Sequence, residues 1–286
     1  MIEHPPTFDD SYSRLHYPFP MALKLQRQLS KDYQGPIFVW DLDKTYLNTR
    51  FSQLKHLLRI PFELGVDKSA VRGTPELLHG LRDGPDGQGQ VPIYFVSASP
   101  RQLGNAVEAK MLLDGIQYDG LIFKDASKLL LQGRLKELKH QVAFKLCALF
   151  TLFESLPPKA GVHLVGDDVE SDALIYALFA DMVSGHLMGK RLERALMKAG
   201  VLPPFIEIIE ELAQSCVKRE AVLGIYIRLV RCPDGASLNN FHSGILGWPS
   251  SAALAGHFHR RNFISEASCN QVLMASSPSE IIPGAQ

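Results

Sequence analysis

The sequence has few cysteines and no excess of charge of either sign, and both shortages exclude classes of protein. The four cysteines among 286 residues are far apart and form no Cys-x-x-Cys pair. A zinc ribbon or redox motif is therefore not expected, and a reduced compartment fits best. Lys plus Arg and Asp plus Glu both total 30, so the formal net charge is zero. This balance gives no indication of a nucleic-acid partner.

Long apolar runs are also absent. No run approaches eighteen apolar residues, so we expect no transmembrane segment. The first twenty residues, MIEHPPTFDDSYSRLHYPFP, are polar and rich in proline, and they contain no apolar stretch typical of a signal peptide. We therefore expect a cytoplasmic location. Hydrophobic residues make up 46% of the chain, which is enough for one large, well-packed α/β domain.

Short apolar runs rich in β-branched and aromatic residues recur along the chain. Such runs are typical of strands that are buried on both faces of a parallel sheet. They are IFVWD at 37–41, PIYFVSA at 92–98, GLIF at 120–123, GVHLVGDD at 161–168 and VLGIYIRLV at 222–230. Helical patterns lie between them, at 75–83, 101–114, 134–156 and 171–183. This alternation predicts βαβ units in a doubly wound, Rossmann-like parallel sheet.

The two ends of the chain do not follow this rhythm. Residues 1–20 resemble an irregular arm, because their prolines block regular structure, and MALKLQRQLSKDY at 21–33 predicts a short amphipathic helix. PSSAALAGHFHRRNFIS at 249–265 fits one helix, and we expect the last stretch to be a disordered tail. The predicted division is 1–34 for an arm and helix, 35–231 for the main domain, and 232–286 for a helical extension with its tail.

Polar side chains follow three of the predicted strands. Parallel strands have their carboxyl ends at one edge of a sheet, where ligands bind in open α/β folds. Five carboxylates and one serine are expected to meet there: Asp41, Asp43, Ser97, Asp167, Asp168 and Asp172. Carboxylates crowded in this way repel one another unless a hard cation neutralises them, and Mg²⁺ prefers oxygen ligands. The sequence therefore predicts a magnesium site at this edge.

Each of these patterns has an ordinary structural explanation when it is taken alone. An Asp pair at a strand end commonly caps the next turn or helix, and Ser97 alone is more often a turn residue than a ligand. GDDVESD at 166–172 could be a cluster that caps the following helix. The occurrence of all three in order, each at a strand end, favours chemistry over capping.

The motifs resemble those of a known superfamily. DLDKT at 41–45, Ser97 within YFVSASP, a lysine ahead of the fourth strand, and GDDVESD resemble the four motifs of the haloacid dehalogenase superfamily. Further phrases are similar to the Mg²⁺-dependent phosphatidate phosphatases of the actin-patch-associated type. They are FKLCALFTLFESLP at 144–157, GDDVESDALIYALFADMV from 166, and GIYIR at 224–228. This resemblance runs from about residue 36 to 230 and implies a haloacid dehalogenase-type domain with little or no cap.

The resemblance also implies roles for the two aspartates after the first strand. Asp41 would attack phosphorus and form an aspartyl-phosphate, which divides hydrolysis into two easier displacements. Asp43 would protonate the leaving oxygen and then deprotonate the water that releases phosphate. Ser97 would donate a hydrogen bond to a phosphoryl oxygen.

Charge neutralisation would come from a metal and a lysine. Mg²⁺ would be held by the Asp41 carboxylate, the Asp43 carbonyl oxygen and Asp167, with Asp172 or Asp168 supporting these ligands. Two lysines could neutralise the transferring phosphoryl group. Lys145 matches the position of the family's lysine, and Lys124, directly after the third strand, is the alternative.

Two positions depart from the family pattern. Lys44 stands where relatives usually have a glycine, a small residue or an acidic one, and Asp168 stands where many relatives have a serine. Neither change removes a group that the chemistry requires. Both could alter the substrate or metal site.

Three functions remain open at this point. The first is hydrolysis of phosphatidate at a membrane surface, the second is hydrolysis of a soluble phosphomonoester, and the third is non-catalytic phospholipid binding. About fifty residues separate DLDKT from the second strand and indicate no independent cap, which favours bulky substrates. The retained Asp43 disfavours a binding-only module. HLMGKRLERALMKAG at 186–200 predicts a basic amphipathic helix, which could lie on an anionic membrane or pack on the core.

Overall fold

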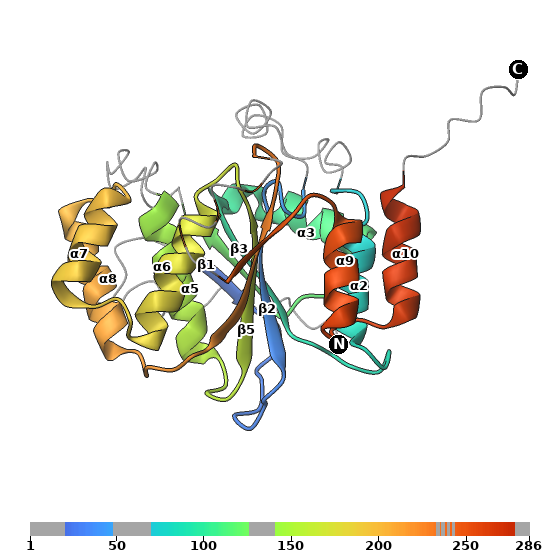
Figure 1. The fold of residues 1–286 in the computed structure, drawn as a ribbon, viewed down its shortest axis with the longest axis horizontal. Coiled ribbons are helices and arrows are strands. Elements are labelled where there is room, and N and C mark those ends of the chain that lie inside the picture. Colours follow the sequence, from blue (N-terminus) through green and yellow to red (C-terminus); the bar gives the residue numbers. More distant parts are fainter. Residues whose placement is uncertain are drawn as a thin grey trace, which may run out of the picture.

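The computed structural model describes residues 21–47, 70–125, 141–232 and 244–277, together with positions 235, 238 and 241 (Figure 1). The predicted arm at 1–20 lies outside the described residues. So do the first part of the helix predicted at 134–156 and almost all of the predicted tail. The segment from 48 to 69 is also outside them, and it forms much of the stretch between DLDKT and the second predicted strand, where a cap would be inserted.

A seven-stranded sheet forms the centre of the molecule, with the strand order β1-β4-β3-β2-β5-β6-β7. Its strands are β1 Met21–Leu25, β2 Pro36–Asp41, β3 Ile93–Pro100, β4 Gly120–Lys124, β5 Gly161–Asp167, β6 Val222–Arg228 and β7 Ile245–Trp248. All neighbouring pairs are parallel except β1 with β4. The five predicted strands and the mostly parallel α/β sheet are confirmed.

The chain changes direction across the sheet at β2. From β2 it moves outward through β3 and β4, and it then returns to the other side of β2 to add β5, β6 and β7. Such a reversal leaves a crevice at the carboxyl ends of the two strands that flank it. Trp40 pairs with Val165, so Asp41 and Asp167 emerge from neighbouring strands at the same edge.

Helices cover both faces of the sheet (Figure 1). One face carries α5 Gln141–Ser155, α6 Asp172–Ser184, α7 Gly189–Lys198 and α8 Pro203–Ser215. The other carries α2 Thr74–Asp83, α3 Gly104–Leu113, α9 Ser251–Arg260 and α10 Glu266–Ser276. A short 3₁₀ turn, η2 Arg101–Leu103, precedes α3. Two separate hydrophobic cores result, one on each side of the sheet.

Helix α5 is apolar around most of its circumference. Every residue from Ala143 to Phe153 is buried, because the helix is enclosed by the sheet and neighbouring helices. A helix that is hydrophobic on all sides must be buried in this way. Its one lysine in this stretch, Lys145, is therefore carried into the interior.

The basic helix predicted at 186–200 corresponds to α7, which packs on the core. Leu192 and Leu196 are buried against α8 and its neighbours, whereas Lys190, Arg191, Arg194 and Lys198 are exposed. Within the described parts of the chain, no helix has the length and apolar character needed to cross a bilayer.

The helix predicted at 21–33 is wrong. Residues 21–25 form β1, an edge strand that pairs antiparallel with β4 from Met21↔Lys124 to Leu25↔Gly120. Pairing with the open edge of a sheet overrides the weak local helical pattern. The contact that decides this structure is formed with a segment nearly one hundred residues away.

The region after residue 232 is more regular than the sequence indicated. Strand β7 extends the sheet beside β6. The helix predicted at 249–265 is α9, which ends at Arg260, and α10 follows it as a further helix that was not predicted. Both helices belong to the second core. Ser250 and Ser265 cap α9 and α10, accepting hydrogen bonds from the amides of Ala253 at 3.3 Å and Ser268 at 3.0 Å. Serine is a preferred N-cap residue, so the sequence contains a signal for the starts of both helices.

Candidate active site

Three buried carboxylates meet at the carboxyl edge of the sheet. Asp41 ends β2, Asp167 ends β5 and Asp172 begins α6, and none of the three is exposed to solvent. One carboxylate oxygen from each lies within 4.8 Å of the other two. The strand ends and the helix start thus bring together three of the predicted metal-site residues.

Lys145 projects from α5 into this cluster. Its Nζ lies 2.7 Å from Oδ1 of Asp41, 2.8 Å from Oε2 of Glu170 and 2.5 Å from Oδ1 of Asp172. The ammonium group has three donors, and each of these carboxylates can accept one. Glu170 was not predicted as a site residue, although it lies inside the GDDVESD motif.

Asp43 is held by two serines from the end of β3. The hydroxyl groups of Ser97 and Ser99 both donate to Oδ2 of Asp43, at 3.1 and 2.6 Å. The Ser99 amide in turn donates to Oγ of Ser97 at 3.0 Å. The predicted Ser97 therefore lies next to the predicted Asp43, and Ser99, two residues further on, is an additional site residue that the sequence analysis missed.

Thr45 connects Asp41 with Asp167. Its Oγ1 lies 3.4 Å from Oδ2 of Asp41 and 3.4 Å from Oδ2 of Asp167. A hydroxyl has one proton to donate, so it satisfies at most one of these oxygens at a time. The other oxygen of Asp167 accepts from the amides of Val169 and Glu170, at 2.6 and 2.9 Å. Asp167 is consequently fixed with one oxygen directed toward Asp41.

Gly166 allows Asp172 to approach the strand. A Cβ at this position would come within 2.5 Å of Oδ2 of Asp172, the oxygen that accepts from the Asp167 amide at 3.3 Å. No larger residue fits without moving that carboxylate. The glycine of GDDVESD is thereby explained by packing at the site.

The loop after β2 turns sharply at Lys44. This residue has a φ of 64°, in the left-handed region that favours glycine. The amides of Tyr46 and Leu47 both donate to the Leu42 carbonyl, and Arg228 from β6 donates to the Lys44 carbonyl. A glycine would adopt this backbone conformation without strain, whereas Lys44 adopts it under strain.

The electrostatics of the cluster are dominated by burial and by an excess of carboxylates. Burial raises the pKa of Asp41 well above its ordinary value, although Lys145 opposes this, and Asp172 and Glu170 raise it further. Burial likewise raises the pKa of Asp167, Glu170 and Asp172. Burial alone would lower the pKa of Lys145, but Asp172, Asp41 and Glu170 outweigh it and hold that pKa well above its usual range.

One ammonium group therefore faces more carboxylates than it can neutralise. The oxygens of Asp41, Asp167 and Asp172 are close enough to share a small ion, and all three are hard donors of the type that Mg²⁺ prefers. Carboxylates with pKa values raised by one another's charge gain most from such a cation. The donor set thus fits a divalent metal.

Asp168 points to a different part of the molecule. Its carboxylate accepts from the amides of Val230, Arg231 and Cys232 at 2.8–3.0 Å, so it fixes the loop after β6. Asp167 ends β5 and Asp168 begins the turn that follows, so the two carboxylates have different partners. Among the described residues, the Asp168 carboxylate has no contact with the metal-site carboxylates that would support its predicted role.

The two candidate lysines lie in different surroundings. Lys145 contacts the Asp41 carboxylate directly, as described above. Lys124 is also buried, at the end of β4, and its Nζ lies 5.5 Å from the centre of the Phe144 ring.

The fold and this site define an α/β protein with a buried acidic centre at the switch point of a mostly parallel sheet. A family model described as "Phosphatidate phosphatase APP1, catalytic domain" matches residues 37–189, which is more than half of the chain. The chain belongs to this family, whose description is that of a phosphoric monoester hydrolase. Comparisons with curated proteins and with solved structures gave no match. The matched segment contains Asp41, Lys145, Asp167 and Asp172, together with Asp43, Ser97 and Glu170.

Proposed function

We propose that this chain hydrolyses phosphate monoesters by an Mg²⁺-dependent mechanism in which Asp41 becomes phosphorylated, and that phosphatidate is its substrate. One observation carries the proposal: Lys145 fixes one oxygen of Asp41, and carboxylate oxygens of Asp167 and Asp172 lie within reach of a shared ion. Such an arrangement fits a nucleophile beside a cation site. The family match supports the phosphatase activity and the choice of substrate.

In the first step, an oxygen of Asp41 attacks phosphorus while the bond to the ester oxygen breaks. Lys145 holds Oδ1 of Asp41, and Thr45 faces Oδ2, so the carboxylate is oriented before substrate arrives. Lys145 also places a positive charge beside the transferring phosphoryl group, where stabilisation of developing charge contributes most to the rate. The product of this step is an aspartyl-phosphate on Asp41 and a released alcohol.

Asp43 is proposed to move the protons. It donates a proton to the leaving ester oxygen in the first step and accepts one from water in the second. Ser97 and Ser99 fix the orientation of Oδ2 of Asp43 through their hydroxyl groups. Ser97 is expected to turn from Asp43 to a phosphoryl oxygen when substrate binds.

Mg²⁺ would be held by carboxylate oxygens of Asp41 and Asp167 and by the Asp43 carbonyl oxygen, and Asp172 would position them through Lys145 and the Asp167 amide. When bound, the ion would supply positive charge that keeps the carboxylates ionised and neutralises the phosphoryl group. We assign no metal-binding role to Asp168, whose carboxylate is engaged by the loop after β6.

We also propose that the domain is of the haloacid dehalogenase type. The sheet has the order β4-β3-β2-β5-β6, with the proposed nucleophile at the end of the central strand β2. The other two strands that end in a motif, β3 and β5, flank β2 on either side. All residues with a proposed role lie within 35–231. Residues 42–47, which follow Asp41, are called the nucleophile loop below. Helix α2 lies between this loop and β3 in the sequence, and it packs with α9 and α10 rather than over the site.

The substrate proposal is a phospholipid at a membrane surface, reached from the cytoplasm. The four cysteines are all free, as in proteins of a reducing compartment. Hydrolysis of phosphatidate within a bilayer requires the carboxyl edge of the sheet to face the lipid headgroups. The proposal thus commits to this edge as the membrane-facing side.

A phosphate-release assay tests both levels of the proposal. The protein is incubated with Mg²⁺ and either vesicles of phosphatidate in phosphatidylcholine or soluble phosphomonoesters. We expect release from phosphatidate, loss of release in EDTA and in Asp172→Asn, and near-normal release in the matched control Asp168→Asn. Release from soluble esters alone would refute phosphatidate as the substrate. No release from any substrate, together with vesicle binding that survives Asp41→Asn, would refute hydrolysis altogether.

A further inference from the structure

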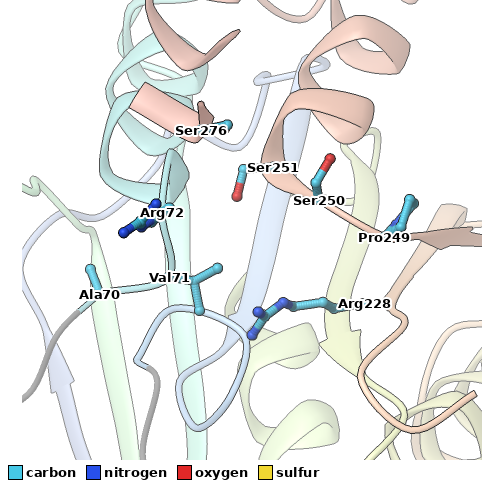
Figure 2. A pocket seen from close by; sticks show the side chains of 8 residues that line it. All are labelled: Ala70, Val71, Arg72, Arg228, Pro249, Ser250, Ser251 and Ser276. Carbon is cyan, nitrogen blue, oxygen red and sulfur yellow. The ribbon is translucent and has the colours of Figure 1, made fainter. Parts of the chain in front are cut away.

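A polar cavity lies against the nucleophile loop, because two of its lining residues, Val71 and Arg228, donate hydrogen bonds to that loop. It has a volume of about 510 Å³, within the usual range for small-ligand pockets. The chain segment 70–72, the end of β6 and the start of α9 enclose it, with Ser276 of α10 closing one side (Figure 2). Of its lining residues, Ala70, Val71 and Arg72 lie within the segment that the family model matches, and the other five lie beyond it.

The described lining of this cavity is positive and contains no carboxylate. Arg72 and Arg228 supply two guanidinium groups, and Ser250, Ser251 and Ser276 supply hydroxyl groups. Figure 2 shows the Arg228 side chain extending from β6 toward Val71, with Ser250 and Ser251 at the start of α9. A planar guanidinium can form paired hydrogen bonds to phosphate oxygens, so the chemistry of the lining fits a phosphate group.

Arg228 has donors available for such a ligand. One of its terminal nitrogens donates to the Lys44 carbonyl, which is its one hydrogen bond within the described residues. A guanidinium has five N–H groups, so the others can serve a ligand. Arg72 is exposed and forms no ion pair within the described part of the chain.

The first turn of α9 adds backbone donors to these side chains. Ser250 Oγ accepts the Ala253 amide, whereas the amides of Ser251 and Ala252 have no acceptor within a helix by geometry. Amides at a helix start are directed at anions, and the helix dipole favours negative charge there.

One hydroxyl group of the lining also lacks a partner among the described residues. Oγ of Ser276 is shielded from solvent and has no hydrogen-bond partner among the described residues. A buried hydroxyl without a partner costs free energy, so such groups in native proteins usually bind a ligand or water.

We infer that this cavity binds a phosphate group beside the carboxylate cluster. Arg228 links the two, because its guanidinium group also interacts electrostatically with Asp167 and Asp168. The two sites share the nucleophile loop, because Arg228 holds the Lys44 carbonyl and the Val71 amide donates to the Tyr46 carbonyl at 2.8 Å. A phosphate on Arg228 therefore contacts the opposite side of the loop that carries Asp43. Inorganic phosphate and a lipid headgroup offer the same chemistry to this site.

The test measures phosphate binding in EDTA, where the carboxylate cluster repels anions and no turnover occurs. Calorimetric titration of the full chain with inorganic phosphate is paired with amide NMR spectra. We expect binding with shifts at Ser251 and Ala252. Arg72→Gln should weaken binding about 10-fold or more, the usual effect of losing a charge-assisted hydrogen bond. The matched variant Arg191→Gln, which removes an exposed arginine of α7, should bind as the unchanged chain does.

Two further titrations identify the source of the phosphate group. Glycerol 3-phosphate and vesicles of phosphatidate in phosphatidylcholine replace inorganic phosphate, with pure phosphatidylcholine as the blank. Arg72-dependent binding of vesicles assigns the site to headgroups, and Arg72-dependent binding of the small anions alone assigns it to free phosphate. Absence of binding for all three probes, or equal binding by the unchanged chain and Arg72→Gln, overturns the inference. Because no hydrolysis is measured, this result is independent of the proposed activity.

Discussion

Two buried ionic clusters lie at opposite ends of the same sheet, and they differ in charge balance. At the amino edge, Asp119 is 1% exposed, and its Oδ2 lies 2.6 Å from Arg82 Nη1. Arg27 Nε lies 2.7 Å from Oδ1, close enough for an ion pair although not aligned for a hydrogen bond. The Ile93 amide also donates to this carboxylate, at 2.8 Å. The Asp119 carboxylate is thus paired with two guanidinium groups, which is more positive charge than its neutralisation requires.

At the carboxyl edge the ratio is reversed. One ammonium group, on Lys145, faces the carboxylates of Asp41, Glu170 and Asp172, with Asp167 next to them. Buried charge is tolerated when it is paired and hydrogen-bonded, as at Asp119. Buried groups with unbalanced charge are typical of functional sites. The difference supports the proposal that the carboxyl-edge cluster performs the chemistry, whereas the balanced amino-edge cluster stabilises the fold.

The largest effect is expected from Asp41→Asn. An amide cannot act as the nucleophile, so phosphate release should fall on the order of 10⁴-fold or more. The free energy of unfolding in EDTA should stay the same or rise, because one of several crowded carboxylates is removed. Steady-state phosphate release and urea denaturation measure the two quantities. A large loss of stability would contradict the functional assignment of this cluster.

The second largest effect is expected at the other cluster. Asp119→Asn leaves Arg27 and Arg82 without their shared carboxylate, and breaking a buried pair costs about 3–5 kcal/mol of the free energy of unfolding. Phosphate release per folded molecule should be unchanged. Urea denaturation measures the stability of Asp119→Asn, and a phosphate-release assay measures its activity. A variant that loses activity but keeps its stability would show that the amino-edge cluster does not act mainly on the fold.

His163, a buried histidine of β5, should make the free energy of unfolding depend on pH. It packs on the rings of Phe38 and Phe263 and lies 3.3 Å from the Tyr226 hydroxyl, and burial lowers its pKa to about 4. The unfolded chain has the ordinary value of about 6.5 and binds the proton first as pH falls. Stability is therefore full above pH 6.5, and about 3 kcal/mol should be lost between pH 6.5 and 4.

Urea denaturation across that pH range measures this loss. His163→Gln should flatten the dependence, whereas His186→Gln, which changes an exposed histidine, should leave it intact. An unchanged slope in His163→Gln would assign the acid sensitivity to other groups.

The smallest effect is expected at the strained turn between Asp43 and Thr45. Lys44→Gly removes the strain of a left-handed lysine and should raise the free energy of unfolding by about 0.5–1 kcal/mol. Arg194→Gly, in the middle of the exposed face of α7, should instead lower it by about 1 kcal/mol. Thermal denaturation of both variants compares the two signs. A destabilised Lys44→Gly would mean that the lysine side chain has a stabilising contact that outweighs the backbone strain.

The central sheet could be predicted because its strands are continuous apolar runs that end at polar residues. β1 could not, because its sequence has a helical pattern and its structure depends on pairing with β4. β7, with only four residues, is too short to give a periodic signal. Both missing strands lie at the edges of the sheet, where distant contacts decide the structure.

The candidate site could be predicted in part for a similar reason. Asp41 and Asp167 follow from the strand ends alone. Glu170 and Thr45 could not be identified, because their contacts depend on how α5 and the nucleophile loop pack in three dimensions. Asp168 was grouped with Asp167 by its position in the motif, but its carboxylate contacts the loop after β6, and the motif contains no sign of that contact.

The most direct test of the account is a rapid-quench experiment with phosphatidate and Mg²⁺. It uses the unchanged chain, with samples quenched within the first turnover. Acid quenching followed by peptide mass spectrometry locates any covalent phosphate. The account predicts phosphate on the peptide that contains Asp41, formed before free phosphate appears. Phosphate release by the unchanged chain that persists in Asp41→Asn, with no phosphorylated peptide at any time, would contradict it.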